Sequence, residues 1–168
     1  MYVTILLSLA LVSGSAAPGT QEKPKPAPAA TKPAATKPAA AGAARTVEIA
    51  AGDDMKYSVT SIAAKPGETL HIKLVSKGTL PKIAMAHNVV VLKAGAKQID
   101  FVNAAATARA TDFIPPDMKD QVLAASGLAG PGETVEATVK IPAAGSYPFV
   151  CTFPGHFAAG MKGTIVAK

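Results

Sequence analysis

The stretch that decides the fold is residues 147–163, YPFVCTFPGHFAAGMKG. Its first residues place two aromatic side chains on the same side as Cys151, which is the alternation expected of a β-strand. A Pro-Gly turn follows and can bring His156 back towards Cys151, and Met161 closes the loop from its far end. The sequence therefore predicts a strand that ends in a compact loop carrying a thiol, an imidazole and a thioether.

Short apolar runs of the same kind fill most of the chain between residues 46 and 168. They lie at residues 47–50, 57–62, 69–75, 87–92, 134–141 and 163–167, with Gly- and Pro-containing turns between several of them. In the run 69–75 the apolar residues share one face, so His71 on the other face should point to solvent. About seven or eight short strands with turn signals between them predict an all-β sandwich.

One segment interrupts the strand pattern. Between residues 97 and 126 the sequence becomes Ala-rich, in the stretches 99–110 and 117–125, and Pro115-Pro116 divides the two. We expect one or two short helices in this segment, inserted between strands and lying outside the sandwich.

The first 45 residues differ from the rest in composition. Residues 3–12 form an apolar run of the length of a signal-peptide core, followed by small residues, and the run is too short for a stable membrane span. Residues 18–45 are rich in Pro, Ala and Lys and contain no large apolar residue, so they cannot build a core. We predict a signal peptide at 1–17, a disordered linker at 18–45 and one domain at 46–168, exported to the periplasm or secreted.

The distribution of charge argues against a nucleic-acid partner. Of the formal net charge of +6, residues 1–45 supply five Lys+Arg and one acidic residue, and residues 46–168 supply the other 12 and 10. A nucleic-acid-binding domain is expected to gather its basic residues on one face. Here the excess lies in the spaced tail, and the domain is nearly neutral.

Three segments hold candidate metal ligands: residues 85–88 (MAHN), residues 151–156 (CTFPGH) and Met161. The chain has a single cysteine, so Cys151 cannot form an internal disulfide. Taken singly, a buried cysteine, a histidine or a methionine is more often part of a core than a ligand. Together, a thiolate, two imidazoles and a thioether match the blue-copper arrangement, whereas zinc rarely binds methionine. The donor set therefore indicates one mononuclear copper site.

The same residues resemble a known family. Residues 147–163 and 85–88 are similar to the plastocyanin/azurin family, and to azurin most of all. Weaker agreement extends over residues 52–57 (GDDMKY) and 80–82 (LPK), so the resemblance covers most of residues 46–168. It implies a cupredoxin fold, which is a Greek-key β-sandwich.

The resemblance also implies roles for individual residues. The two imidazoles would bind copper through ring nitrogens, the cysteine as a thiolate and the methionine as a distant axial ligand, and Asn88 would tie the ligand loops together. The ligand set is then His87, Cys151, His156 and Met161. Three features depart from azurin: Met161 follows His156 by five residues rather than four, Ala86 replaces a glycine, and the two disulfide cysteines are absent. The longer spacing matches plastocyanin, and Ala86 is left out of the ligand set.

The function implied by this resemblance is the transport of single electrons by Cu(II)/Cu(I) cycling. The carrier would be a monomer whose redox partners, such as cytochromes or copper enzymes, dock briefly on apolar residues around His156. These residues are Met55, Pro154, Phe157 and Ala158. The alternative is a carrier or buffer that delivers copper rather than electrons, although no Met-rich or His-rich tract accompanies the site. An enzyme is not expected, because copper oxidases need further copper centres and the domain has only one other histidine, His71.

Overall fold

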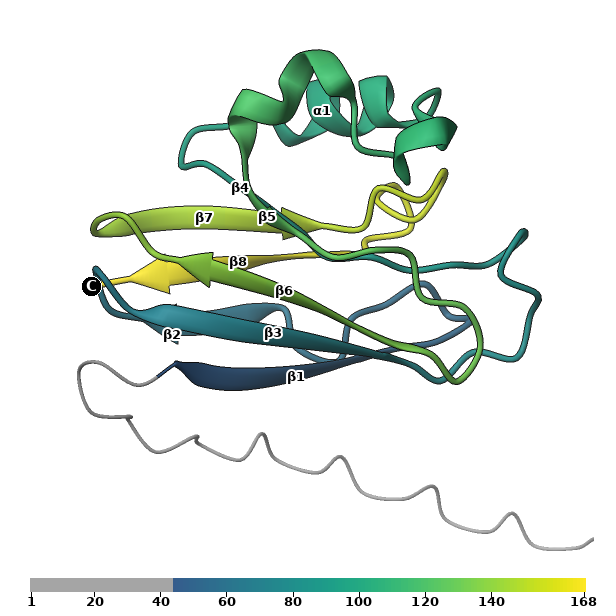
Figure 1. Cartoon of the computed structure of the whole chain (residues 1–168), viewed down its shortest axis with the longest axis horizontal. Coiled ribbons are helices and arrows are strands. Elements are labelled where there is room, and N and C mark those ends of the chain that lie inside the picture. Colours follow the sequence, from purple (N-terminus) through teal and green to yellow (C-terminus); the bar gives the residue numbers. More distant parts are fainter. Residues whose placement is uncertain (1–43) are drawn as a thin grey trace, which may run out of the picture. The chain divides into compact units, whose positions relative to one another are not determined.

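Two sheets form the part of the chain that the computed structural model describes, residues 44–168 (Figure 1). The predicted signal peptide and nearly all of the predicted linker lie outside the described residues. The strands are β1 (Arg45–Ala51), β2 (Ser61–Ala64), β3 (Thr69–Ser76), β4 (Val90–Leu92), β5 (Val122–Ala125), β6 (Thr134–Lys140), β7 (Gly145–Val150) and β8 (Lys162–Ala167). One sheet has the order β1-β3-β6 and the other β2-β8-β7-β4-β5. The predicted all-β sandwich is confirmed.

Strand β3 shows how the apolar pattern builds the smaller sheet. Its residues alternate between buried and half-buried, as predicted, and it pairs in parallel with β1 and antiparallel with β6. Leu70 lies opposite Val139 in this register, and both side chains are buried in the core between the sheets. On the outer face His71 is half-buried, and its Nδ1 lies 2.9 Å from Thr138 Oγ1.

Strand β7 is buried on both faces, which the sequence alternation alone does not show. Phe149 points into the core between the sheets. Val150 belongs to a second apolar cluster with Val90, Leu92 and Phe101, the last of which lies in helix α1 (Gln98–Ala105). The helical segments cover this side of the larger sheet in Figure 1. The insertion therefore shields the strand that leads to Cys151 from solvent.

The Ala-rich insertion holds short helical segments as expected, with α1 in its first stretch, but its second stretch, residues 117–125, ends as a strand. Two 3-10 turns, Arg109–Thr111 and Pro116–Gln121, follow α1, and strand β5 comes directly after the second of them. β5 pairs antiparallel with β4, whose other edge pairs with β7. Pairing satisfies the backbone groups along the free edge of β4, and this tertiary demand overrides the helical preference of an Ala-rich sequence.

Two predicted strands begin later than expected. The run 57–62 contributes only its end to β2, while Tyr57 forms an isolated bridge with Ala51. The run 87–92 forms β4 from residue 90 onward, and His87 forms an isolated bridge with Ala129. In both places the backbone of the residue is paired at one isolated bridge instead of along a continuous strand.

The order of strands brings distant parts of the sequence to one end of the larger sheet. β7 ends where β4 and β8 begin, because β7 is antiparallel to both. The loops at this end lie opposite the C-terminus of the chain (Figure 1). None of the helices in the described residues is long and apolar enough to cross a membrane.

Candidate metal centre

Three buried donors meet at the end of β7. β4 and β7 pair through Val90 and Val150, so the residues just before β4 lie beside those just after β7. One donor atom each from His87, Cys151 and His156 lie within 4.8 Å of one another. Cys151 Sγ is 3.5 Å from His156 Nδ1, and the two imidazole ring centroids are 5.0 Å apart. The structure thus brings together three of the four ligands predicted from the sequence.

The donors are held away from water. His87 and Cys151 are fully buried, and His156 is 2% exposed. Within residues 44–168, neither ring nitrogen of His87 has a hydrogen-bond partner. A buried polar group without a partner costs about 1–3 kcal/mol. A metal ion at the point shared by the three donors would satisfy one of these two nitrogens, and a set of one thiol and two imidazoles suits copper.

Burial also sets the protonation of the metal-free site. Burial raises the pKa of the Cys151 thiol to about 11, although the backbone N–H groups of Asn88 and Phe153 act in the opposite direction. Burial lowers the pKa of His156 to about 4, and the neighbouring charge of His87 adds to this effect. The pKa of His87 is lowered by burial as well. Near pH 7 the metal-free site therefore holds a neutral thiol and two neutral imidazoles.

This protonation state predicts how many protons copper displaces. At pH 7, binding of Cu(II) to the metal-free protein should release about one proton per copper, because only the thiol must ionise to become a ligand. Below the His156 pKa of about 4, that imidazole is protonated too, so the number of protons released should rise and the affinity for copper should fall. A pH-indicator titration at several pH values measures this release.

The control for this titration is Cys151→Ser, which should release no proton at pH 7. Release of two or more protons per copper from the wild-type protein at pH 7 would contradict the neutral state of the imidazoles.

Asn88 fastens the segment before β4 to the loop after β7. Its Nδ2 donates to Thr152 Oγ1 at 2.8 Å, and its Oδ1 accepts from the Thr152 backbone N–H at 2.9 Å. Asn88 is fully buried, and Thr152 is 2% exposed. These two residues follow His87 and Cys151 directly in sequence, so the pair fixes the separation of two donors. The bonds agree with the role that the family resemblance implied for Asn88.

Met161 closes the loop on the far side of the donors. It is fully buried and belongs to the same apolar cluster as Cys151. Its backbone N–H donates to His156 O at 3.0 Å, and its carbonyl accepts from Cys151 N at 3.1 Å. The residue is therefore attached through its backbone to two of the donors. Its thioether as an axial ligand stays a prediction.

Sequence reasoning missed two residues that contact the donor segments and one, Asp53, in the same connection. Tyr57 is 5% exposed, and its hydroxyl donates to the backbone carbonyl of Asn88. Lys56 donates to the carbonyl of Ala159 within the ligand loop. The Asp53 carboxylate accepts from the backbone and hydroxyl of Thr79. The resemblance of residues 52–57 to azurin marked the segment but gave no role to these side chains.

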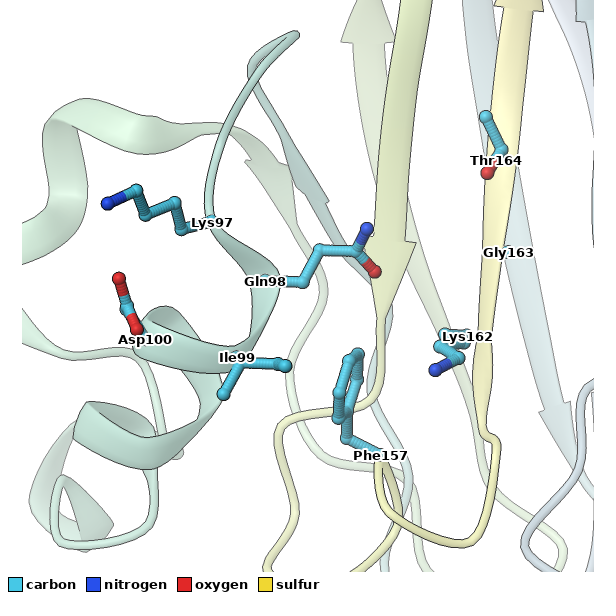
Figure 2. A pocket seen from close by; sticks show the side chains of 8 residues that line it. All are labelled: Lys97, Gln98, Ile99, Asp100, Phe157, Lys162, Gly163 and Thr164. Atoms are coloured by element: carbon cyan, nitrogen blue, oxygen red, sulfur yellow. The ribbon is translucent and has the colours of Figure 1, made fainter.

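The surface beside the donors is partly apolar. Of the predicted docking residues, Pro154 and Ala158 are exposed, while Met55 and Phe157 are half-buried. A surface cavity of about 620 Å³ lies next to Phe157. Figure 2 shows Phe157 facing residues at the start of α1 on one side, with the first residues of β8 on the other. Lys162 Nζ lies 4.4 Å from the centroid of the Phe157 ring.

A two-sheet sandwich with one buried thiol and two buried imidazoles at one end defines a cupredoxin. A family model described as copper binding proteins, plastocyanin/azurin family, matches residues 43–168. The chain belongs to this family, and the resemblance predicted from its sequence is confirmed. Copper as the cofactor is confirmed with it, since His87, Cys151 and His156 are placed to form a type 1 copper site.

Similar proteins include auracyanins and azurins. Auracyanin-B of Chloroflexus aurantiacus is 36% identical over 124 residues, which are 73% of this chain and 52% of that protein. The chain thus spans about half the length of that relative. Azurin of Pseudomonas aeruginosa is 34% identical over 127 residues, 73% of this chain and 84% of that protein. The solved structure of auracyanin A, a "blue" copper protein of Chloroflexus aurantiacus, has a TM-score of 0.67 at 32% identity and covers 75% of this chain and 100% of its own.

Proposed function

We propose that this protein carries single electrons between redox partners by Cu(II)/Cu(I) cycling, with His87, Cys151, His156 and Met161 as the ligands. The observation that carries the proposal is the closed, buried cluster of three donors, with both ring nitrogens of His87 left without a protein partner. Copper bound there supplies a one-electron couple. No catalytic activity is part of the proposal.

The surrounding residues support electron transfer because they keep the donors in place. The backbone N–H of His156 donates to Phe153 O, and that of Met161 donates to His156 O, so the ligand loop is fastened to itself. The backbone N–H groups of Asn88 and Phe153 favour the thiolate form of Cys151. Hydrogen bonds to a ligand sulfur tune the reduction potential of a copper site. Ligands that hardly move also keep the reorganisation that accompanies electron transfer small.

The test compares movement of electrons with movement of copper. The full chain, loaded with Cu(II), should show an intense thiolate-to-copper absorption band and a narrow hyperfine splitting in electron paramagnetic resonance. In stopped flow, the loaded protein should exchange electrons with a reduced c-type cytochrome much faster than it loses Cu(I) to a competing chelator. A colourless protein, or copper loss on the time scale of electron exchange, would favour a carrier or buffer that delivers copper.

The proposal includes a docking surface for the redox partner around His156. His156 is 2% exposed, so a partner would reach only a narrow edge of its ring, across the apolar residues Pro154 and Ala158. Small and partly apolar surfaces suit brief contacts between redox proteins. We infer that the partner meets the protein here as a monomer.

Ala158→Asp should slow electron exchange with the cytochrome about 10-fold, because it places an unpaired charge in this contact and thereby lowers the association rate. The visible spectrum and the reduction potential should stay those of the wild type. Stopped-flow kinetics at several salt concentrations measure the effect.

The matched control is Ala144→Asp, at another exposed alanine, which lies in the turn before β7 at the other end of that strand. Equal rates in the Ala158→Asp variant, the Ala144→Asp variant and the wild type would exclude docking at this surface.

Export to the periplasm or secretion remains part of the proposal. It is supported by the apolar run of residues 3–12 and the small residues that follow. Mass spectrometry of the protein recovered from its producing cells should find an N-terminus near residue 18, and an intact N-terminus on the mature protein would contradict export by a cleaved signal peptide.

A further inference from the structure

Residues 52–58, in the connection between β1 and β2, contact both parts of the chain that carry the donors. On one side the hydroxyl of Tyr57 donates to the carbonyl of Asn88, next to His87. On the other side the ammonium group of Lys56 donates to the carbonyl of Ala159, which lies between two of the proposed ligands. Neighbouring side chains of one short segment thus reach two loops that are far apart in sequence.

Lys56 supplies a bond that the ligand loop does not make for itself. Within that loop the N–H groups of residues 159, 160 and 161 donate to the carbonyls of residues 155, 157 and 156. Among residues 44–168, no backbone N–H donates to the carbonyl of Ala159. Within the described part of the chain, the one hydrogen bond to this carbonyl comes from Lys56, 103 residues earlier in the sequence. Lys56 thus contacts the loop two residues before Met161.

The ammonium group of Lys56 also lies beside Gly160, the residue directly before Met161. The φ of Gly160 is +97°, a conformation that side chains rarely adopt. A Cβ atom added to Gly160 would lie 2.8 Å from Lys56 Nζ. The ammonium group thus occupies the space beside Gly160 that a side chain would need. Lys56 therefore approaches the loop at both Ala159 and Gly160, the two residues before Met161.

The other end of Lys56 is firmly held. Tyr57 is 5% exposed, its ring lies 5.5 Å from that of Phe149, and it forms a bridge with Ala51. Met55, on the other side, has a left-handed φ of 54° and donates its N–H to Gly52 O at 3.0 Å. Lys56 itself is exposed. A lysine on a fixed backbone with its head bonded to a loop carbonyl is more constrained than a free surface lysine.

We propose that Lys56 is a positioning residue that holds the 156–161 loop, and with it Met161, against the metal site. The hydrogen bond fixes the loop, and the positive charge lies on the loop that carries two of the proposed ligands, where it favours the state with one more electron. The expected effect of Lys56 on the reduction potential rests on the proposed function, whereas the expected effect of Lys56 on the ligand loop does not. These two effects can be separated by substitution.

Three variants separate the bond from the charge. Lys56→Met removes both, Lys56→Gln keeps a donor without the charge, and Lys56→Arg keeps both. Lys77→Met is the matched control, because Lys77 is exposed and lines the same small surface cavity as Lys56, yet has no bond to the ligand loop. Since Lys56 and Lys77 are both exposed, all four variants should fold, and their far-ultraviolet circular dichroism checks this.

The first measurement uses the copper-free protein. Amide hydrogen exchange at Gly160 and Met161 should be faster in Lys56→Met than in the wild type, and Lys56→Arg should restore slow exchange. After loading, Lys56→Met should lose copper to a chelator about 10-fold faster, which is the usual scale for losing a partner in the outer shell of a metal site. Lys77→Met should match the wild type in both measurements.

The second measurement is the reduction potential of the loaded protein. It should fall in Lys56→Met and Lys56→Gln and stay unchanged in Lys56→Arg and Lys77→Met. Hydrogen exchange and copper loss in Lys56→Met that equal those of the wild type would overturn the positioning role. If the wild-type protein lacks the blue band, the proposed function fails, and hydrogen exchange and copper loss still decide the role of Lys56.

Discussion

Cys151→Ser is expected to abolish the thiolate-to-copper band and to stop electron exchange, while the sandwich stays folded. The thiol is the only sulfur donor of its kind in the chain, and the site brings it within 4.8 Å of both imidazole donors. Serine has nearly the same size but is a far weaker ligand for copper, so the affinity for Cu(I) should fall by several orders of magnitude. Absorption, electron paramagnetic resonance and competition with a Cu(I) chelator measure the loss.

Stability gives the control for this substitution. The serine hydroxyl replaces a buried thiol that lies 3.5 Å from His156 Nδ1, so a hydrogen bond to the ring can compensate part of its burial. The free energy of unfolding of the copper-free protein should change by no more than about 2 kcal/mol. A serine variant that keeps the blue band would show that Cys151 is not the ligand. If the serine variant unfolds, His87→Ala tests the site instead, by the same absorption and resonance spectra.

The ligand loop could be predicted from sequence because it is local. Cys151, His156 and Met161 lie within 11 consecutive residues, and a turn between them suffices to bring them together. His87 lies 64 residues before Cys151. Its place beside Cys151 depends on the pairing of β4 with β7, which strand propensity does not specify. Only the resemblance to a known family connected the two segments before the structure did.

Strand β5 shows where local pattern fails. Residues 117–125 belong to the Ala-rich segment in which the sequence predicts one or two short helices, yet the last four of them pair with β4 as a strand. Its residues are all half-buried, with no alternation that would reveal a strand. Residues 122–125 form a strand because they pair with the edge of β4 that β7 leaves free, and that edge exists only once the sheet has assembled.

The supporting residues could not be predicted for a related reason. A lysine or a tyrosine in a short connecting segment is ordinarily a surface or core residue, and nothing in residues 52–58 marks a partner. The contacts of Lys56 and Tyr57 span 103 and 31 residues of sequence. Such contacts follow from the tertiary structure, and they link the connection after β1 to the two donor segments.

Asn88→Ala should lower the free energy of unfolding of the copper-free protein by about 3 kcal/mol, because it leaves the buried N–H of Thr152 without a partner and removes the side-chain bond between the two residues. Asn88 is fully buried, and its amide makes bonds of 2.8 and 2.9 Å to Thr152. In the loaded protein the separation of His87 and Cys151 should become less fixed, so copper should also be lost faster. Urea denaturation of the copper-free protein measures the first effect without the contribution of bound metal.

Thr152→Val is the matched control for this prediction. It removes the hydroxyl and keeps the backbone N–H that donates to Asn88 Oδ1, so it should cost less than Asn88→Ala. The double variant should cost less than the sum of the two single ones, because both substitutions break the same side-chain bond. Strictly additive effects, or a smaller cost for Asn88→Ala than for Thr152→Val, would show that this pair does not hold the two ligand segments together.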